Sequence, residues 1–208
     1  MTNVLIVENE RIVQEMLSTY VASAPDRYSL VGIIADAANT EVVCLRSQVD
    51  LILMDVCTEN DESGIDATAV IKKRHPNIKV IIVTSAPEVT FLHKARLAKA
   101  DSFYYKNISE QKLLDVMDRT MRDECIWPDE TPPVQIGNTM STEFTSTELK
   151  VLRYLTDGYS ITEIAKMMGV KESTTRYHVD NLKDKIGVKT ITGVVRMVTK
   201  KQLILPEF

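Results

Sequence analysis

The sequence predicts two folded parts, an α/β doubly wound parallel five-stranded sheet followed by a small all-α helix-turn-helix domain. The first 123 residues alternate short apolar runs with helical patterns, which is typical of a parallel sheet with helices on both faces. From residue 141 onward every pattern is helical. The charge divides in the same way: residues 1–140 carry 14 basic and 21 acidic side chains, and residues 141–208 carry 11 and 8. This asymmetry indicates that the two parts have different binding partners.

The strands of the first part are short apolar runs, which we expect at residues 3–7, 30–35, 51–54, 79–84 and 102–105. The run at 51–54 is apolar at every position, as in strands that are covered on both faces. Helical patterns separate and follow these runs, and we expect helices at 10–23, 40–46, 64–74, 88–98 and 110–122. The helix at 10–23 carries its apolar residues on one face, and Pro76 ends the helix at 64–74.

The second part follows a linker that we place at residues 124–142, so that the predicted domains are 1–123 and 143–208. Pro128, Pro132 and Pro133 lie in this linker among small and polar residues. Ile126 and Trp127 are too apolar for a free linker, so we expect its first part to pack on a domain. Four helices are predicted beyond it, at 147–157, 161–168, 172–186 and 191–201, and a glycine turn separates the second helix from the third.

The composition excludes several classes of protein. Hydrophobic residues make up 44% and charged residues 26%, which excludes a disordered chain and a collagen-like fibre. The longest apolar stretches fall far short of the roughly 20 residues that a membrane span needs, and the N-terminus does not resemble a signal peptide. We therefore expect a cytoplasmic protein without a membrane partner. Cys44, Cys57 and Cys125 are too few and too widely spaced for a disulfide framework or a zinc site.

Polar residues follow four of the predicted strands, at the edge of the sheet where such folds bind ligands. Glu8 and Asn9 follow the first strand, Asp55 follows the third, Thr84 ends the fourth and Lys106 follows the fifth. An aspartate can attack a phosphoryl group, and Mg²⁺ binds carboxylate oxygens and neutralises phosphoryl charge. A lysine and a hydroxyl can hold the remaining phosphoryl oxygens. The sequence therefore predicts a phosphoryl site, although each of these residues taken alone is typical of a turn, a helix cap or a solvated side chain.

Residues 1–123 resemble the receiver domain of bacterial two-component response regulators. The resemblance is carried by the segments 4–8, 51–55, 80–85 and 100–106, which keep the order of the family. It implies that Asp55 is the phosphoacceptor for a sensor histidine kinase and that Lys106 pairs with the phosphoryl group. It also implies that Thr84 moves to bond this group and that Phe103 is the aromatic residue that changes rotamer with it. No residue of the chain is assigned a catalytic role, and we do not expect an enzyme.

The same resemblance implies a Mg²⁺ site, held by Glu8, Asn9, Asp55 and the backbone carbonyl of Cys57. Two departures weaken it. Asn9 stands where the family usually has a second acid, and its neutral amide oxygen is a weaker ligand for Mg²⁺. The loop after Asp55 lacks the usual Met-Pro pair, is one residue longer, and carries three acids, Glu59, Asp61 and Glu62. A solvated acidic loop is the favoured interpretation; the alternatives are a compensating metal ligand or repulsion of a phosphodonor.

Residues 143–205 resemble the LuxR-type DNA-binding domain of NarL/FixJ regulators, on the segments 144–152, 157–165, 170–179 and 185–188. The third helix of this part then enters the major groove with its N-terminal end. Its apolar stripe is expected to pack inward, and the candidate DNA-binding residues lie mainly on the other face: Lys171, Thr174, Arg176, Tyr177, Asp180 and Lys183. Arg176 and Tyr177 are the candidates for base contacts, and Lys171, Thr174 and Lys183 for phosphate contacts.

Some of these residues have alternative interpretations. Arg176 and Lys183 fit an ordinary solvated helix face, and Asp180 departs from the family because it would repel phosphate, although it could accept a hydrogen bond from a cytosine amine. The fourth helix carries a stripe of Ile191, Val194, Val195 and Val198, which in the family contributes to dimerisation on DNA and otherwise is simply core.

We therefore predict a NarL/FixJ-type transcription regulator that is phosphorylated on Asp55 and binds DNA as a homodimer. The expected partners are DNA, a sensor histidine kinase, a second copy of the chain and RNA polymerase, and the expected cofactor is Mg²⁺. One alternative is an orphan regulator that works without phosphorylation. A remote alternative is a phosphatase of the haloacid-dehalogenase type, whose nucleophile loop is faintly similar to residues 55–58 but needs a second Asp at the position of Cys57.

Overall fold

A computed structural model describes residues 1–106 and 110–205, without the side chains of Asp61, Glu110 and Gln111. The first part is built on a parallel five-stranded sheet in the order β2-β1-β3-β4-β5. The strands are β1 (Thr2–Val7), β2 (Tyr28–Ile34), β3 (Leu51–Met54), β4 (Lys79–Thr84) and β5 (Ser102–Tyr105). The predicted doubly wound α/β fold is therefore confirmed.

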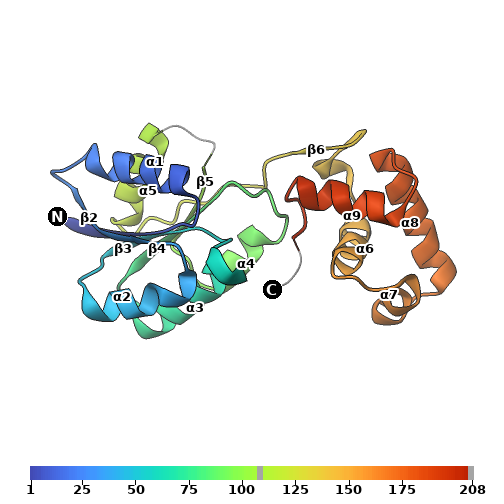
Figure 1. Ribbon diagram of the computed structural model, residues 1–208, viewed down its shortest axis with the longest axis horizontal. Helices are drawn as coiled ribbons and strands as arrows, with labels where there is room; N and C mark the ends of the chain where they lie inside the picture. The colour runs from blue at the N-terminus through green and yellow to red at the C-terminus, as the bar shows by residue number, and fades with distance from the viewer. Residues whose placement is uncertain (107–109, 206–208) are drawn as a thin grey trace. The chain divides into compact units, whose positions relative to one another are not determined.

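Helices cover both faces of this sheet (Figure 1). On one face lie α1 (Arg11–Ala22) and α5 (Glu110–Thr120), and on the other lie α2 (Thr40–Arg46), α3 (Gly64–Arg74) and α4 (Phe91–Leu97). Two short 3₁₀ helices, η1 (Ala37–Asn39) and η2 (Glu59–Asp61), lie in the loops. The three central strands are almost wholly apolar and inaccessible, because a parallel sheet buries both of its faces.

Two element boundaries differ from the sequence prediction by more than one residue at their start. Strand β2 begins at Tyr28 instead of residue 30, and the Tyr28 side chain is buried in the core of the first part. Helix α4 begins at Phe91 instead of residue 88, because the β-branched Val89 and Thr90 form a turn before it. Helix α5 ends at Thr120, two residues earlier than expected.

The second part is helical, with α6 (Ser146–Thr156), α7 (Ile161–Met168), α8 (Glu172–Ile186) and α9 (Ile191–Lys200) around a separate apolar core. Capping boxes start α6 and α7: the Thr145 and Ser160 hydroxyls accept from backbone N–H groups three residues on, and Glu148 and Glu163 bond back. Gly169 ends α7 in the left-handed region, with φ of 66°, and so forms the turn before α8. The predicted helix-turn-helix is confirmed.

The region that we predicted to be a linker contains secondary structure that the sequence prediction lacked. The two-residue strands β6 (Gln135–Ile136) and β7 (Thr139–Met140) form an antiparallel hairpin, and η3 (Ser141–Glu143) follows it. Ile136 is fully buried in the core of the second part. Met1–Ser85 and Thr90–Glu130 form one compact unit, and Ala86–Val89 belongs to the other unit with residues 131–205. Within the described ranges, every helix is too short or too polar to span a bilayer.

Candidate functional site

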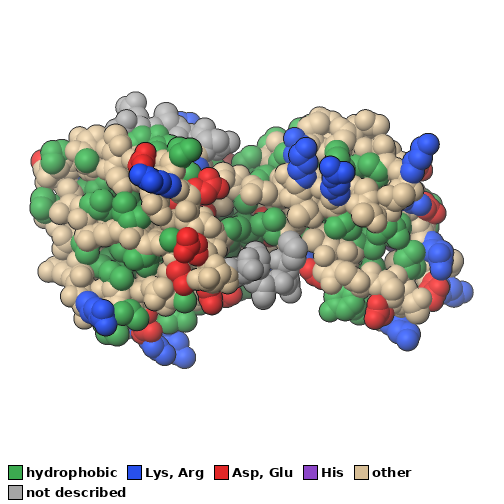
Figure 2. Space-filling view, in the orientation of Figure 1, with side chains coloured by type: hydrophobic (Ala, Val, Ile, Leu, Met, Phe, Trp, Pro, Cys, Tyr) green, Lys and Arg blue, Asp and Glu red, His purple; other side chains and the backbone are tan. Residues whose placement is uncertain are grey.

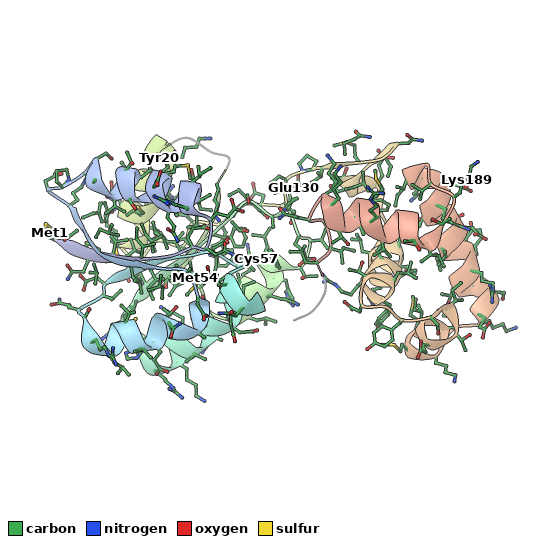
Figure 3. All side chains as sticks on the ribbon, viewed as in Figure 1. Met1, Tyr20, Met54, Cys57, Glu130 and Lys189 are labelled. Carbon is green, nitrogen blue, oxygen red and sulfur yellow. The ribbon has the colours of Figure 1, made fainter. Side chains whose placement is uncertain are left out.

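Four of the predicted site residues lie at the carboxyl ends of the parallel strands. Glu8 follows β1, Asp55 follows β3, Thr84 is the last residue of β4 and Lys106 follows β5. The sheet register fixes their backbones, because the Asp55 N–H donates to the Val7 carbonyl at 2.8 Å and the Lys106 N–H donates to the Thr84 carbonyl at 2.9 Å. Figure 3 labels Met54, the last residue of β3, and Cys57, which lies three positions further on in the loop that follows Asp55. The structure thus brings together the strand-end residues that the sequence singled out.

The Lys106 ammonium bridges the two buried carboxylates of this pocket. Its Nζ lies 2.5 Å from Glu8 Oε2 and 2.9 Å from Asp55 Oδ1. The Glu8 side chain is 0% exposed and those of Asp55 and Lys106 are each 8% exposed, so water screens these ion pairs little. The other Glu8 oxygen accepts a hydrogen bond from the Glu10 N–H at 2.9 Å. Both oxygens of Glu8 are therefore engaged by donors of the chain.

The charged groups of the pocket shift the pKa of Asp55 in opposite directions. Burial raises the pKa of Asp55, the Lys106 ammonium lowers it and the Glu8 carboxylate raises it, and together these effects place that pKa at about 6. Burial would lower the pKa of Lys106, but the attraction of the two carboxylates outweighs it and raises that pKa above its ordinary value. At neutral pH Asp55 is thus mostly a carboxylate beside an ammonium, which is the protonation state that a phosphoryl acceptor needs.

The turn that follows Asp55 requires glycine at one position. A Cβ atom on Gly64 would lie 1.8 Å from the Asp55 carbonyl oxygen, so no side chain fits there. The Gly64 N–H donates to the Val56 carbonyl at 2.9 Å, which closes the loop between β3 and α3. Ser63 then caps α3 by accepting from the Asp66 N–H. The close packing of Gly64 against the Asp55 carbonyl therefore fixes the position of the Asp55 backbone.

The pocket offers the oxygen donors that a hard divalent cation prefers, but it carries little net negative charge. The carboxylates of Glu8 and Asp55, the half-buried Asn9 amide and the Cys57 carbonyl are all oxygen donors, which Mg²⁺ prefers. In the described part of the chain, however, no three acidic, histidine or cysteine side chains gather closely enough to hold a metal ion. Lys106 already offsets one of the two negative charges. The residues therefore fit a weakly held Mg²⁺.

The acidic loop after Asp55 bonds to the end of β2. The Glu59 N–H donates to the Ala35 carbonyl at 2.9 Å, and Asn60 Nδ2 donates to Asp36 Oδ2 at 3.1 Å. Glu59 and Glu62 are exposed, as expected for a solvated loop, and the side chain of Asp61 lies outside the described residues. For these two glutamates, the predicted solvated loop agrees with the structure better than a compensating metal ligand does.

The candidate DNA-binding residues lie on helix α8, at its N-terminal side and along one face. Four residues with inward-facing side chains are buried: Thr175, Val179, Leu182 and Ile186. Tyr177 is 63% exposed, and Lys171, Thr174, Arg176 and Asp180 are exposed as well, whereas Lys183 is half-buried. The structure therefore exposes the predicted contact residues to solvent, except that Lys183 is only partly exposed.

Acidic neighbours on the same helix pair with both basic side chains of the α8 face. Lys183 Nζ lies 2.6 Å from Asp180 Oδ1, and Arg176 Nη2 lies 3.6 Å from Glu172 Oε2. Figure 2 likewise shows both acidic and basic side chains on the visible face of this part of the chain. The local charge of the helix is therefore close to balanced.

The apolar stripe of α9 packs into the core of the second part of the chain. Val194 and Val198 are fully buried, and Ile191 and Val195 pack against the same core. The structure thus favours the core interpretation for this stripe. A dimer contact through α9 would have to use its other side chains.

Two features of the first part were missed or only partly found from the sequence. Gly64 shows its role only in the structure, although a glycine nine residues after Asp55, at the first position of a helix, was a usable signal. Trp127 was expected to pack on a domain, and it lies against Phe103 with ring centroids 5.9 Å apart. Phe103 itself is 2% exposed, and the sequence did not indicate that this residue and Trp127 meet.

Two family models match the chain. Residues 4–118 match the response regulator receiver domain, and residues 142–198 match the bacterial regulatory proteins of the luxR family. The response regulator protein VraR of Staphylococcus aureus strain Mu3 is 31% identical over 209 residues, which covers 97% of this chain and 98% of VraR.

Solved structures of the same architecture are more distant in sequence. A structure of two RcsB dimers bound to two parallel DNAs aligns with a TM-score of 0.66 at 17% identity, over 95% of this chain and 98% of that one. The response regulator ChrA of a heme-sensing two-component system aligns with a TM-score of 0.53 at 20% identity, over 97% and 98% of the two chains. At these identities the likeness shows the fold.

Proposed function

Because the chain belongs to the response regulators that join a receiver domain to a LuxR-type DNA-binding domain, we propose that it is a transcription regulator switched by phosphorylation of Asp55. The observation that carries the proposal is the buried Lys106 ammonium between the Glu8 and Asp55 carboxylates at the ends of the parallel strands. We assign the receiver to residues 1–123, the linker to 124–142 and the DNA-binding domain to 143–208.

The phosphotransfer uses groups that are already in place. An Asp55 carboxylate oxygen attacks the phosphorus of a phosphohistidine on the sensor kinase; the new O–P bond forms as the P–N bond breaks, and the electron pair stays on the histidine nitrogen. Lys106 then exchanges part of its pairing with Glu8 for the phosphoryl oxygens. The Thr84 hydroxyl, at the end of the adjacent strand, donates to another phosphoryl oxygen.

A divalent cation bound in the pocket would offset further negative charge of the carboxylates and the phosphoryl group. Glu8, Asp55, the Asn9 amide and the Cys57 carbonyl are the residues that would hold Mg²⁺, which supplies neutralisation of phosphoryl charge when bound. With Asn9 in place of a second acid, we expect weaker Mg²⁺ binding than in receivers with two consecutive acids.

The second domain is proposed to read DNA through α8. Arg176 and Tyr177 project from the N-terminal half of this helix, where a recognition helix meets base edges, and Arg176 suits a guanine. The candidates for phosphate contacts are Thr174, Lys171 and Lys183. The ion pair with Asp180 weakens the attraction of Lys183 for a DNA phosphate.

Two copies of the chain would bind half-sites about one helical turn apart, as is usual for helix-turn-helix dimers. We further propose that phosphorylation shifts an existing equilibrium toward the dimer, that the regulator works in the cytoplasm, and that its partners are a sensor histidine kinase and RNA polymerase at the promoter. The structure of two RcsB dimers bound to two parallel DNAs supports the dimeric mode.

One structural feature favours a second candidate function. Both Glu8 oxygens are bound by donors of the chain, Lys106 offsets one of the two carboxylate charges and Asn9 adds none, so the pocket keeps a net charge of only −1 without metal or phosphate. This arrangement suits an orphan regulator of the same fold, which binds DNA constitutively or under the control of another ligand.

The test is a selection of duplexes from a random DNA library with the full chain, before and after incubation with phosphoramidate and Mg²⁺. The proposal expects a shared sequence motif whose recovery rises after phosphodonor treatment of the wild type but not of Asp55→Ala. Arg176→Ala should lose the preference for that motif. Equal recovery by wild type and Asp55→Ala would support the orphan regulator, and no motif at all would contradict DNA readout.

A further inference from the structure

The first residues after the receiver helices lie along the free edge of β5. The Phe103 N–H donates to the Ile126 carbonyl at 2.9 Å, and the Ile126 N–H donates to the Ser102 hydroxyl oxygen at 3.0 Å. Because β5 is the last strand of the sheet, this edge would otherwise present unpaired backbone groups to water. The chain leaving the receiver is therefore attached to the strand that ends at the phosphoryl pocket.

The side chains of this region form a stack across two elements. The Trp127 ring lies 5.9 Å from the Phe103 ring on β5, and the Arg96 guanidinium of α4 lies over the Trp127 ring at 4.9 Å. Phe103 also contacts the Tyr105 ring at 5.0 Å. Aromatic pairs and cation–π contacts at these distances are attractive. We call Arg96, Phe103 and Trp127 the aromatic clasp.

The aromatic clasp limits the motion of Phe103. Phe103 is 2% exposed, so its ring can change rotamer only if a neighbour gives way. Trp127 is half-buried and belongs to an irregular segment, whereas the other ring beside Phe103, Tyr105, is held in β5. Trp127 is thus the neighbour that can move at least cost.

We propose that Trp127 is a positioning residue, which holds Phe103 in its buried rotamer in the unphosphorylated protein and leaves it when Asp55 is phosphorylated. Lys106 directly follows β5, three residues after Phe103, so transfer of its ammonium from Glu8 to a phosphoryl group acts on the strand that carries Phe103. When Trp127 leaves Phe103, the segment that follows Trp127 is no longer attached to β5. This segment connects the receiver to the DNA-binding domain. This inference rests on the proposed phosphorylation of Asp55.

Trp127 is the only tryptophan of the sequence, so its fluorescence reports on the clasp directly. The experiment follows emission and acrylamide quenching of the full chain during incubation with phosphoramidate and Mg²⁺, with intact mass measured on the same samples. The inference expects a red shift and a larger quenching constant that grow with the phosphoryl adduct and are absent in Asp55→Ala. An adduct with unchanged fluorescence overturns the inference and leaves the proposed function standing, whereas the absence of an adduct overturns both.

Substitutions with matched controls distinguish an effect of the aromatic clasp from a general effect on folding. Arg96→Gln removes one side of the stack from an exposed position and should raise Trp127 quenching before phosphorylation, while the exposed Arg46→Gln should not. Trp127→Leu should raise the phosphorylated fraction that is reached at equilibrium with a fixed phosphodonor concentration, because linkage requires that a group favouring the unphosphorylated state also opposes phosphorylation. The exposed linker variant Asp129→Asn should match the wild type. Unchanged quenching in Arg96→Gln, or an unchanged phosphorylated fraction in Trp127→Leu, overturns the assignment.

Discussion

Replacing Lys106 with methionine tests the charge arrangement of the pocket. Methionine keeps much of the length of the lysine side chain but cannot pair with Glu8 and Asp55, which lie 2.5 and 2.9 Å from the ammonium. The Glu8 side chain is fully inaccessible and that of Asp55 is 8% exposed. The variant therefore leaves two buried carboxylates side by side without a counter-charge.

The expected loss is large compared with the stability of a domain. Removing one partner of a buried ion pair costs about 3–5 kcal/mol, because the remaining charge keeps its desolvation penalty. We expect Lys106→Met to lose an amount in this range from a total that is typically about 5–15 kcal/mol. Adding Glu8→Gln removes one of the stranded charges, so the double variant should be more stable than the sum of the single losses by about 1–3 kcal/mol.

Urea denaturation followed by Trp127 fluorescence measures this loss, since Trp127 packs on the receiver. The control is Arg11→Met, which breaks an ion pair with Glu15 whose side chains are 89% and 70% exposed and should change the unfolding free energy by less than about 1 kcal/mol. Mg²⁺ should stabilise Lys106→Met more than the wild type, because no ammonium then competes with the cation for the oxygens of Glu8 and Asp55. A loss as small as that of the control, with no gain in the double variant, would refute the buried charge triad.

Three further substitutions have defined outcomes. Burial would raise the pKa of Glu148, but hydrogen bonds from Lys185, at 2.8 Å, and from the N-cap of α6 outweigh it and hold that pKa below its ordinary value. Glu148→Gln should therefore lower the unfolding free energy by about 1–3 kcal/mol at neutral pH in urea titrations followed by circular dichroism, and this difference should shrink as pH falls through the lowered pKa. Asp180→Asn frees Lys183 and should tighten DNA binding and steepen its salt dependence by about one phosphate contact, as measured by fluorescence anisotropy; an unchanged slope would exclude Lys183 from the backbone contacts. Gly64→Ala should cost about 1–3 kcal/mol or more in urea unfolding and slow phosphorylation, because its Cβ would lie 1.8 Å from a backbone oxygen; wild-type stability and rate would contradict that reading.

The strand-end residues could be predicted from the sequence because parallel topology dictates where they lie. Once the apolar runs were identified as parallel strands, Glu8, Asp55 and Lys106 had to meet at one edge of the sheet. The exposed face of α8 followed in the same way from helical periodicity, and Arg176 and Tyr177 are exposed as expected.

Long-range contacts could not be predicted, because they depend on which loops approach one another. The sequence indicated that Trp127 packs on a domain but not that it meets Phe103, which lies 24 positions earlier in the chain. The hairpin of β6 and β7 was missed because its strands have only two residues each, although the Gly137-Asn138 pair at its turn is a known hairpin signal. The hydrogen bond between Asn60 and Asp36 likewise joins segments with no shared pattern.

The phosphorylation of Asp55 is the central claim, and intact mass spectrometry tests it most directly. The full chain and Asp55→Ala are incubated with phosphoramidate and Mg²⁺ under conditions that label another receiver protein. A single phosphoryl adduct on the wild type that is absent from the variant is the predicted result. The absence of an adduct on the wild type, or an adduct that persists in Asp55→Ala, would contradict the account.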